Sequence, residues 1–144
     1  MDGIAVHFGL LDEKASSELA SLFTEMELVA GGILFDYADS AEQCYLLIDG
    51  HLAVHKKTGF LDKMQVVALL DSGAIVGEGA FLHQHQRNTR VSAIEDSKLL
   101  SLSKTDFKQF KEKFPKSANQ ILEYIFSIVS LRLEKTTERL AHIL

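Results

Sequence analysis

The sequence predicts an α+β fold in which a small antiparallel β-barrel or sandwich is flanked by helices. The middle of the chain, about residues 27–103, holds short strand-like runs separated by turn residues, with no long helical pattern between them. This arrangement favours a barrel or sandwich over a sheet of βαβ units. The flanking residues, about 12–26 and 104–144, carry apolar side chains at helical spacing. With 144 residues and no linker or internal repeat, the chain is expected to form one domain over 1–144.

The N-terminal helix is predicted over about 12–26, where apolar residues recur every three or four positions. These are Leu19, Leu22, Phe23 and Met26. The barrel, about 27–103, is expected to be a succession of short strands. These include Ile33 to Phe35, Cys44 to Ile48, His51 to His55, Met64 to Leu70, Arg90 to Ile94 and Leu99 to Leu102. Asp49-Gly50, between two apolar runs, predicts a β-hairpin.

The last segment, about 104–144, is predicted to be helical and to include one long helix. Pro115, the single proline, suits the first turn of a helix, where its missing N–H costs little. Beyond it, apolar residues step alternately by four and three, with one polar interruption, Thr136. This set, which we call the seam, comprises Leu122, Phe126, Val129, Leu133, Thr136, Leu140 and Ile143. Such spacing is typical of a coiled coil.

The seam has two interpretations. It could pack on the protein's own core, or it could meet a second copy in a parallel homodimer. A second apolar set, Ile121, Ile125, Ile128 and Leu131, is available to face the barrel. We therefore expect a homodimer through this helix.

Composition narrows the classes of function. The net charge of −5 argues against direct DNA binding, which draws on clustered lysine and arginine. No apolar run approaches the roughly 20 residues that a membrane-spanning helix needs. Residues Met1 to Gly3 lack the basic start of a secretory signal, and the lone Cys44 excludes an internal disulfide. We expect a cytoplasmic protein without a membrane segment, in which Cys44 is a small core residue.

One segment carries the groups that a cyclic sugar-phosphate requires. Gly77-Glu78-Gly79-Ala80 is followed by Arg87, all within the fifteen residues that end at Val91. Glycines let the backbone approach a ligand closely, and N–H groups at a helix start favour an anion. A carboxylate accepts hydrogen bonds from sugar hydroxyls, while an arginine forks onto phosphate oxygens. The same two charges could instead form a weak surface ion pair.

The chain resembles the cyclic-nucleotide-binding domains, a family that includes the sensor domain of the bacterial catabolite activator, kinase regulatory subunits and gated channels. The resemblance runs from about Phe8 to Leu144 and follows a common order of strands and turns, including Gly32 to Phe35, Tyr45 to Gly50 and Val67 to Gly73. Its most specific element is the phosphate-binding cassette, here Gly77 to Leu82 followed by Arg87 to Val91. The resemblance implies a double-stranded β-helix (jelly roll) with an N-terminal helix, a short cassette helix and a long C-terminal helix.

The resemblance also implies a role for each matching residue. Glu78 would accept from the ribose 2′-hydroxyl, and Arg87 would pair with the cyclic phosphate. The backbone N–H groups of Gly79 and Ala80, in the turn that Gly77 opens, would bind phosphate. Asn88 lies where a small polar residue often assists.

Thr136 and Thr137 fall where the bacterial activator presents hydroxyls to the adenine amino group from both subunits. A second possibility is that Thr136 is only a polar seam residue and Thr137 only a surface one. The implied ligand is cAMP, or less readily cGMP, with no further cofactor and no metal.

Three positions depart from the family pattern. Thr89 replaces the usual alanine near the phosphate, Gly79 replaces an aliphatic residue, and Ala38 replaces the glycine of an early turn. Thr89 also lies close to a place where threonine favours cGMP in some relatives. These departures leave open a degenerate module that keeps the fold and the dimer but binds no nucleotide.

The expected mechanism is a ligand-driven shift in the long helix, with a hinge near Lys111 to Lys116 and an unidentified effector protein downstream. The activator's DNA-binding domain has no counterpart up to Leu144. An alternative of another class is a metal-dependent cupin enzyme that uses His51, His55, His83 and His85. That alternative lacks the downstream glutamate and strand histidine of a cupin, since the later His142 lies at the helix end. No nucleophile–base pair is evident, so we do not expect an enzyme.

Overall fold

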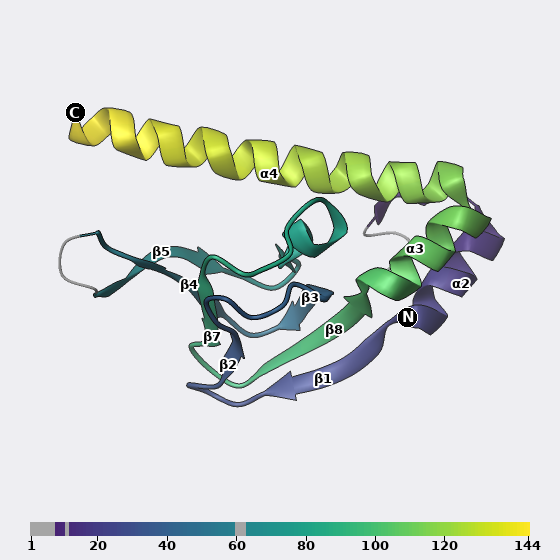
Figure 1. Ribbon diagram of the computed structural model, residues 1–144, viewed down its shortest axis with the longest axis horizontal. Helices are drawn as coiled ribbons and strands as arrows, with labels where there is room; N and C mark the ends of the chain where they lie inside the picture. Colours follow the sequence, from purple (N-terminus) through teal and green to yellow (C-terminus); the bar gives the residue numbers. More distant parts are fainter. Residues whose placement is uncertain (1–7, 11, 60–62) are drawn as a thin grey trace. The chain divides into compact units, whose positions relative to one another are not determined.

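The computed structural model describes residues 8–10, 12–59 and 63–144 (Figure 1). The chain divides into two compact units. The first, which we call the barrel unit, is Phe23–Phe107, and the second, the helical unit, combines Met1–Leu22 with Lys108–Leu144. The expectation of one domain over 1–144 stays a prediction. Residues Met1 to Gly3, on which the absence of a signal was predicted, lie outside the described residues.

Two four-stranded sheets make up the described part of the barrel unit, with strand orders β1-β8-β3-β6 and β2-β7-β4-β5. The strands are β1 (Thr24–Leu28), β2 (Ile33–Phe35), β3 (Gln43–Asp49), β4 (Leu52–Lys57), β5 (Met64–Leu70), β6 (Ile75–Val76), β7 (Arg90–Ala93) and β8 (Ser97–Ser103). All ladders are antiparallel, and the central ladder of the first sheet sets Leu46 opposite Leu100. This is the predicted jelly roll, built as two facing sheets rather than one closed ladder.

The core lies between the two sheets and draws on both. Leu47 of β3 and Leu99 of β8 come from one sheet, and Leu52 of β4 and Val91 of β7 come from the other; all four are nearly inaccessible to solvent. Interdigitation of two inner faces is how antiparallel sheets bury their apolar residues. Cys44 is buried, as predicted for a small core residue, and forms no disulfide.

The predicted helix over 12–26 is shorter in the structure. Helix α2 spans Glu13–Leu22, and the Asp12 carboxylate accepts a hydrogen bond from the Ala15 N–H at its start. Residues 24–26 instead belong to β1, which pairs with β8. In β1 the exposed Glu25 and Glu27 alternate with the half-buried Met26 and Leu28. This period of two outweighs the helical spacing that includes Met26.

The predicted hairpin at Asp49-Gly50 is wrong. Strand β3 pairs with β6 and β8, whereas β4 pairs with β5 and β7, so the chain changes sheets at this turn. Gly50 has φ 117°, and a Cβ atom there would lie 2.1 Å from the Ser97 hydroxyl oxygen. The glycine is therefore required by close packing on Ser97, at the start of β8, and a dipeptide pattern does not reveal such a contact.

The C-terminal segment forms two helices, α3 (Lys104–Lys113) and α4 (Pro115–Ile143), and Pro115 occupies the first turn as predicted. Figure 1 shows α4 as one long, uninterrupted helix. No helix in the described residues is long and apolar enough to cross a membrane. Within the helical unit, the Phe8 and Tyr124 rings meet edge to face, with centroids 5.5 Å apart.

Burial along α4 separates the two apolar sets only in part. Ile121 and Ile125 are buried, whereas Leu131, of the same set, is exposed. The seam is accessible over most of its length: Phe126 is 73% and Leu133 63% exposed. Leu140 and Ile143 are exposed as well.

Candidate functional site

The cassette begins where β6 ends. Gly77 has φ 71°, a left-handed conformation that glycine adopts without strain, and it turns the chain into η1, the 3₁₀ turn Glu78–Phe81. The Ala80 N–H donates to the Gly77 carbonyl at 3.2 Å. Phe81 stacks on Phe107 with ring centroids 4.2 Å apart. The predicted short cassette helix is therefore present and anchored by its buried side.

The chain then returns toward β7 alongside residues 38–41. The Arg87 N–H donates to the Asp39 carbonyl at 2.8 Å, and the Arg87 carbonyl accepts from the Ala38 N–H at 2.9 Å. Ala38 has φ 66°, the one positive φ of a non-glycine residue in the described chain. The turn that holds Arg87 therefore does require a left-handed residue, and alanine occupies it under strain.

Arg87 is the centre of the site. Its side chain is buried, at 4% exposure, and Cζ lies 4.2 Å from the centre of the Phe35 ring. Nη1 donates to the Gly77 carbonyl at 3.0 Å, and Nη2 donates to the Gln43 carbonyl. Arg87 is thus no exposed partner in a weak surface ion pair.

The guanidinium is not fully satisfied by the protein. Nε of Arg87 is buried and has no hydrogen-bond partner among the described residues. Burial lowers the pKa of Arg87 from its ordinary value, and the nearby charge of Glu78 acts in the opposite direction. Burying a charge without compensation is costly, so a buried guanidinium with an unused donor favours an anion beside it.

The other predicted ligand residues of the barrel unit lie on the same two stretches of chain. Glu78 and Gly79, on η1, are half-buried, as is Thr89 just before β7, whereas Asn88 is exposed. The Asn88 carbonyl accepts from Nζ of Lys56 at 3.1 Å. The cassette segments therefore carry a carboxylate, an arginine and polar side chains, and the contact of these residues with a nucleotide stays a prediction.

Thr136 and Thr137 belong to the helical unit, on α4, and both are exposed. Their hydroxyls donate back to the helix, Thr136 to the Arg132 carbonyl at 2.9 Å and Thr137 to the Glu134 carbonyl at 2.8 Å. Their contact with a base stays a prediction.

Gln84 is a site residue that sequence reasoning missed. Its Oε1 accepts from Nη1 of Arg87 at 3.3 Å, and its Nε2 lies 3.5 Å from Oδ1 of Asn88. The sequence drew attention instead to its neighbours His83 and His85 as metal ligands. No group of three or more potential metal ligands is present in the described part of the chain. Nothing in the residue type or spacing marks a glutamine three positions before the arginine.

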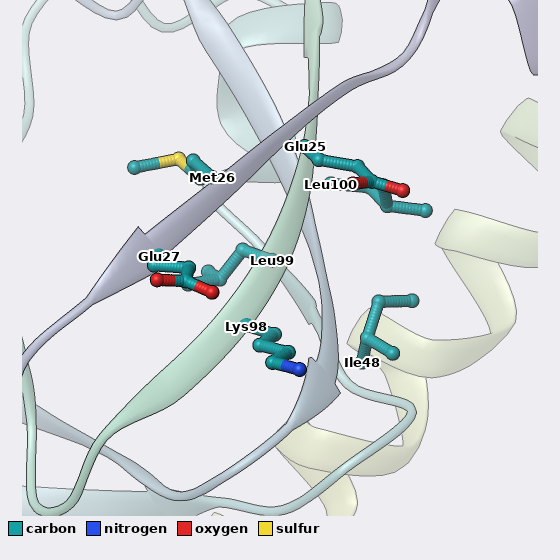
Figure 2. A pocket seen from close by; sticks show the side chains of 7 residues that line it. All are labelled: Glu25, Met26, Glu27, Ile48, Lys98, Leu99 and Leu100. Atoms are coloured by element: carbon teal, nitrogen blue, oxygen red, sulfur yellow. The ribbon is translucent and has the colours of Figure 1, made fainter.

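A hollow of about 580 Å³ lies elsewhere in the barrel unit, beside β1 and β8. Figure 2 shows Glu25 and Glu27 extending from β1 and Lys98 from β8 around it, with Ile48 nearby. Two carboxylates against one ammonium disfavour a phosphate anion there. The cassette is the better candidate for an anion site.

Comparison with known proteins agrees with this geometry. The family model described as "Cyclic nucleotide-binding domain" matches residues 25–114. The chain belongs to the cyclic nucleotide-binding domain family. It is 26% identical over 121 residues to the cyclic AMP receptor protein of Thermus thermophilus. The aligned residues cover 84% of this chain and 55% of that protein.

Two further similarities follow from the same comparisons. Identity is 24% over 126 residues to the cGMP-dependent protein kinase egl-4 of Caenorhabditis briggsae, covering 88% of this chain and 16% of the kinase. A cyclic nucleotide-binding domain structure from Methylobacillus flagellatus superposes with a TM-score of 0.86 at 19% identity, covering 93% of this chain and 75% of that one. The structural likeness supports the fold. The chain spans about half or less of the length of these curated relatives.

Proposed function

We propose that this chain is a regulatory module that binds cAMP, or less readily cGMP, with the cyclic phosphate at the cassette. The observation that carries the proposal is the buried Arg87 guanidinium, whose Nε has no partner among the described residues. A cyclic phosphate brings a negative charge and acceptor oxygens to such a donor. Glu78, half-buried on η1, would accept from the ribose 2′-hydroxyl. The module would act in the cytoplasm and would perform no catalysis.

The test is calorimetric titration with cAMP and cGMP, and then with 2′-deoxy-cAMP. Binding in the micromolar range corresponds to about −8 kcal/mol. We expect Glu78→Gln to lower the affinity for cAMP about tenfold, because loss of a hydrogen bond to a charged group costs about 1.5 kcal/mol. Removing the ligand hydroxyl should then cost the variant little, because the two changes remove one contact. Glu27→Gln, at an exposed position of β1, is the matched control and should bind cAMP as the wild type does.

The competing function is a degenerate module that dimerises without nucleotide. The observation in its favour is that Arg87 already donates to the Gly77 and Gln43 carbonyls. Absence of heat with either nucleotide, together with no shift in melting temperature, would favour that alternative. An equal loss of cAMP affinity in Glu78→Gln and Glu27→Gln would contradict only the role proposed for Glu78.

We infer further that α4 pairs with a second copy through the seam, whose exposed members include Phe126, Leu133 and Leu140. Burying one leucine contributes about 1.5–3 kcal/mol, and a two-fold interface buries it twice. Leu133→Lys should therefore raise the dimer dissociation constant by about a hundredfold or more, measured by sedimentation equilibrium. The control is Ser127→Lys, at an exposed position off the seam. A monomeric wild type, or equal effects of both variants, would refute the dimer.

Ligand binding would act by shifting the break between the two C-terminal helices. The break is Phe114, whose φ of −130° and ψ of 68° are not helical. A ligand can bias this joint only through its different affinity for the two arrangements. Identical distances between spin labels on α3 and α4, with and without bound nucleotide, would contradict the mechanism.

A further inference from the structure

Gln84 lies between Gly79 and Arg87 and is held against η1 by its own backbone. The Gln84 N–H donates to the Gly79 carbonyl at 3.0 Å, which folds the loop back over η1. The side chain then covers Gly79: a Cβ built on that glycine would lie 2.9 Å from Gln84 Oε1 and 3.1 Å from its Cβ. The absence of a side chain at residue 79 is what makes room for Gln84.

The amide of Gln84 lies against Arg87, which binds the phosphate in the proposed function, and against Asn88, the next residue in the chain. Its carbonyl oxygen accepts from Nη1 of Arg87, and its nitrogen approaches Oδ1 of Asn88. An amide oxygen and a phosphate oxygen are both acceptors for a guanidinium N–H. A ligand phosphate bound between Gly79 and Arg87 would have to enter the volume that Gln84 fills.

We propose that the Gln84 side chain fills the phosphate-binding position between Gly79 and Arg87, which we call the phosphate seat. Gln84 leaves this seat when a cyclic nucleotide binds, and the cost of its departure sets the affinity for the nucleotide. This inference rests on the proposed function, since it concerns the same site. The two contacts, at 3.3 and 3.5 Å, are long for hydrogen bonds. They involve a neutral amide, whereas a phosphate brings a full charge to Arg87. The occupant is therefore displaceable and lowers affinity without abolishing binding.

The magnitude follows from the fraction of molecules in which the seat is open. Apparent affinity falls in proportion to the fraction of molecules in which the seat is open. If Gln84 fills the seat in about 80–90% of molecules, binding is weakened about five- to tenfold. Removing the occupant should recover that factor. Gln84→Ala removes the amide, and Gln84→Asn keeps it but shortens the side chain by one methylene group.

The experiment titrates the full chain and these variants with cAMP and with cGMP. We expect both variants to bind the preferred nucleotide about five- to tenfold more tightly than the wild type does. Gln86→Ala, an exposed glutamine in the same loop, is the control and should match the wild type. Thermal unfolding without nucleotide checks that each variant is folded.

The other outcomes separate the two proposals. Unchanged affinity in Gln84→Ala and Gln84→Asn, with Glu78→Gln still weakened, would overturn the inference and leave the proposed function standing. Weaker binding in both variants would make Gln84 a ligand contact rather than an occupant, and would also overturn it. Failure of every folded variant to bind either nucleotide would overturn both proposals.

Discussion

Replacing Gly77 by alanine tests whether Arg87 is held in place or moves freely. The added Cβ would lie 2.9 Å from Nη1 and 3.0 Å from Nη2 of Arg87. The end of a long side chain ordinarily swings away from such a contact at little cost. Arg87, however, is buried on the Phe35 ring and donates to the carbonyls of Gly77 and Gln43. We therefore expect displacement to cost these hydrogen bonds.

A second glycine isolates that cost. Gly31 also has a positive φ, 82°, but a Cβ there meets no atom within 4 Å. Gly31→Ala should lower the free energy of unfolding only through backbone strain, by about 1–2 kcal/mol for an L-residue in the left-handed region. Gly77→Ala should lower the free energy of unfolding by the same backbone strain and, in addition, by about 1.5–3 kcal/mol for one lost hydrogen bond from the charged guanidinium. The change in unfolded-chain entropy is common to both variants and cancels.

The assay is urea denaturation of wild type and both variants, with the slope m checked for constancy. The difference between the two variants should be about 1.5–3 kcal/mol, with Gly77→Ala the less stable. A difference below about 0.5 kcal/mol, within the usual error of additivity, would refute the reasoning. It would show that Arg87 relocates readily and that its burial at the cassette is not enforced.

Two further predictions concern the turns of the barrel unit. His51 hydrogen-bonds Glu95 and lies 3.3 Å from Asp71, and the Glu95 bond is the main cause that raises the pKa of His51. The stabilisation from this contact is complete below the pKa of His51 in the unfolded chain, near 6.5, and is lost as pH rises through its raised pKa in the folded protein. The difference in free energy of unfolding between wild type and His51→Gln, measured in urea from pH 6 to 9, should therefore narrow as pH rises. A constant difference would contradict this. Ala38→Gly should raise the melting temperature, because relief of about 1–2 kcal/mol of left-handed strain exceeds the roughly 0.5–1 kcal/mol entropic penalty of glycine. A lower melting temperature would show that Ala38 is not strained.

Much of the fold could be predicted because its signals are local. The strands predicted at Ile33–Phe35 and Met64–Leu70 have the same bounds in the structure, since each is an apolar or β-branched run bounded by turn residues. Strand β1 was missed because Met26 also continues the helical spacing of Leu19, Leu22 and Phe23, so its pairing with β8 is what distinguishes strand from helix. The short β6 was missed because two residues carry no period. Asp49-Gly50 was misread as a hairpin because a turn signal does not specify which strands it joins.

The sequence by itself determined a barrel or sandwich of short strands with a long C-terminal helix, since strand-like runs, turn residues and helical spacing are local signals. The jelly roll and the cassette residues Glu78 and Arg87 were implied by the resemblance to a family, and the binding role of those residues stays a prediction. Only the tertiary structure decided which groups of the protein surround Arg87. Its burial, its bonds to the Gly77 and Gln43 carbonyls and the amide of Gln84 against it come from segments up to 44 positions apart in the chain. Close packing and hydrogen bonding between such distant segments depend on three-dimensional position, which no local periodicity encodes.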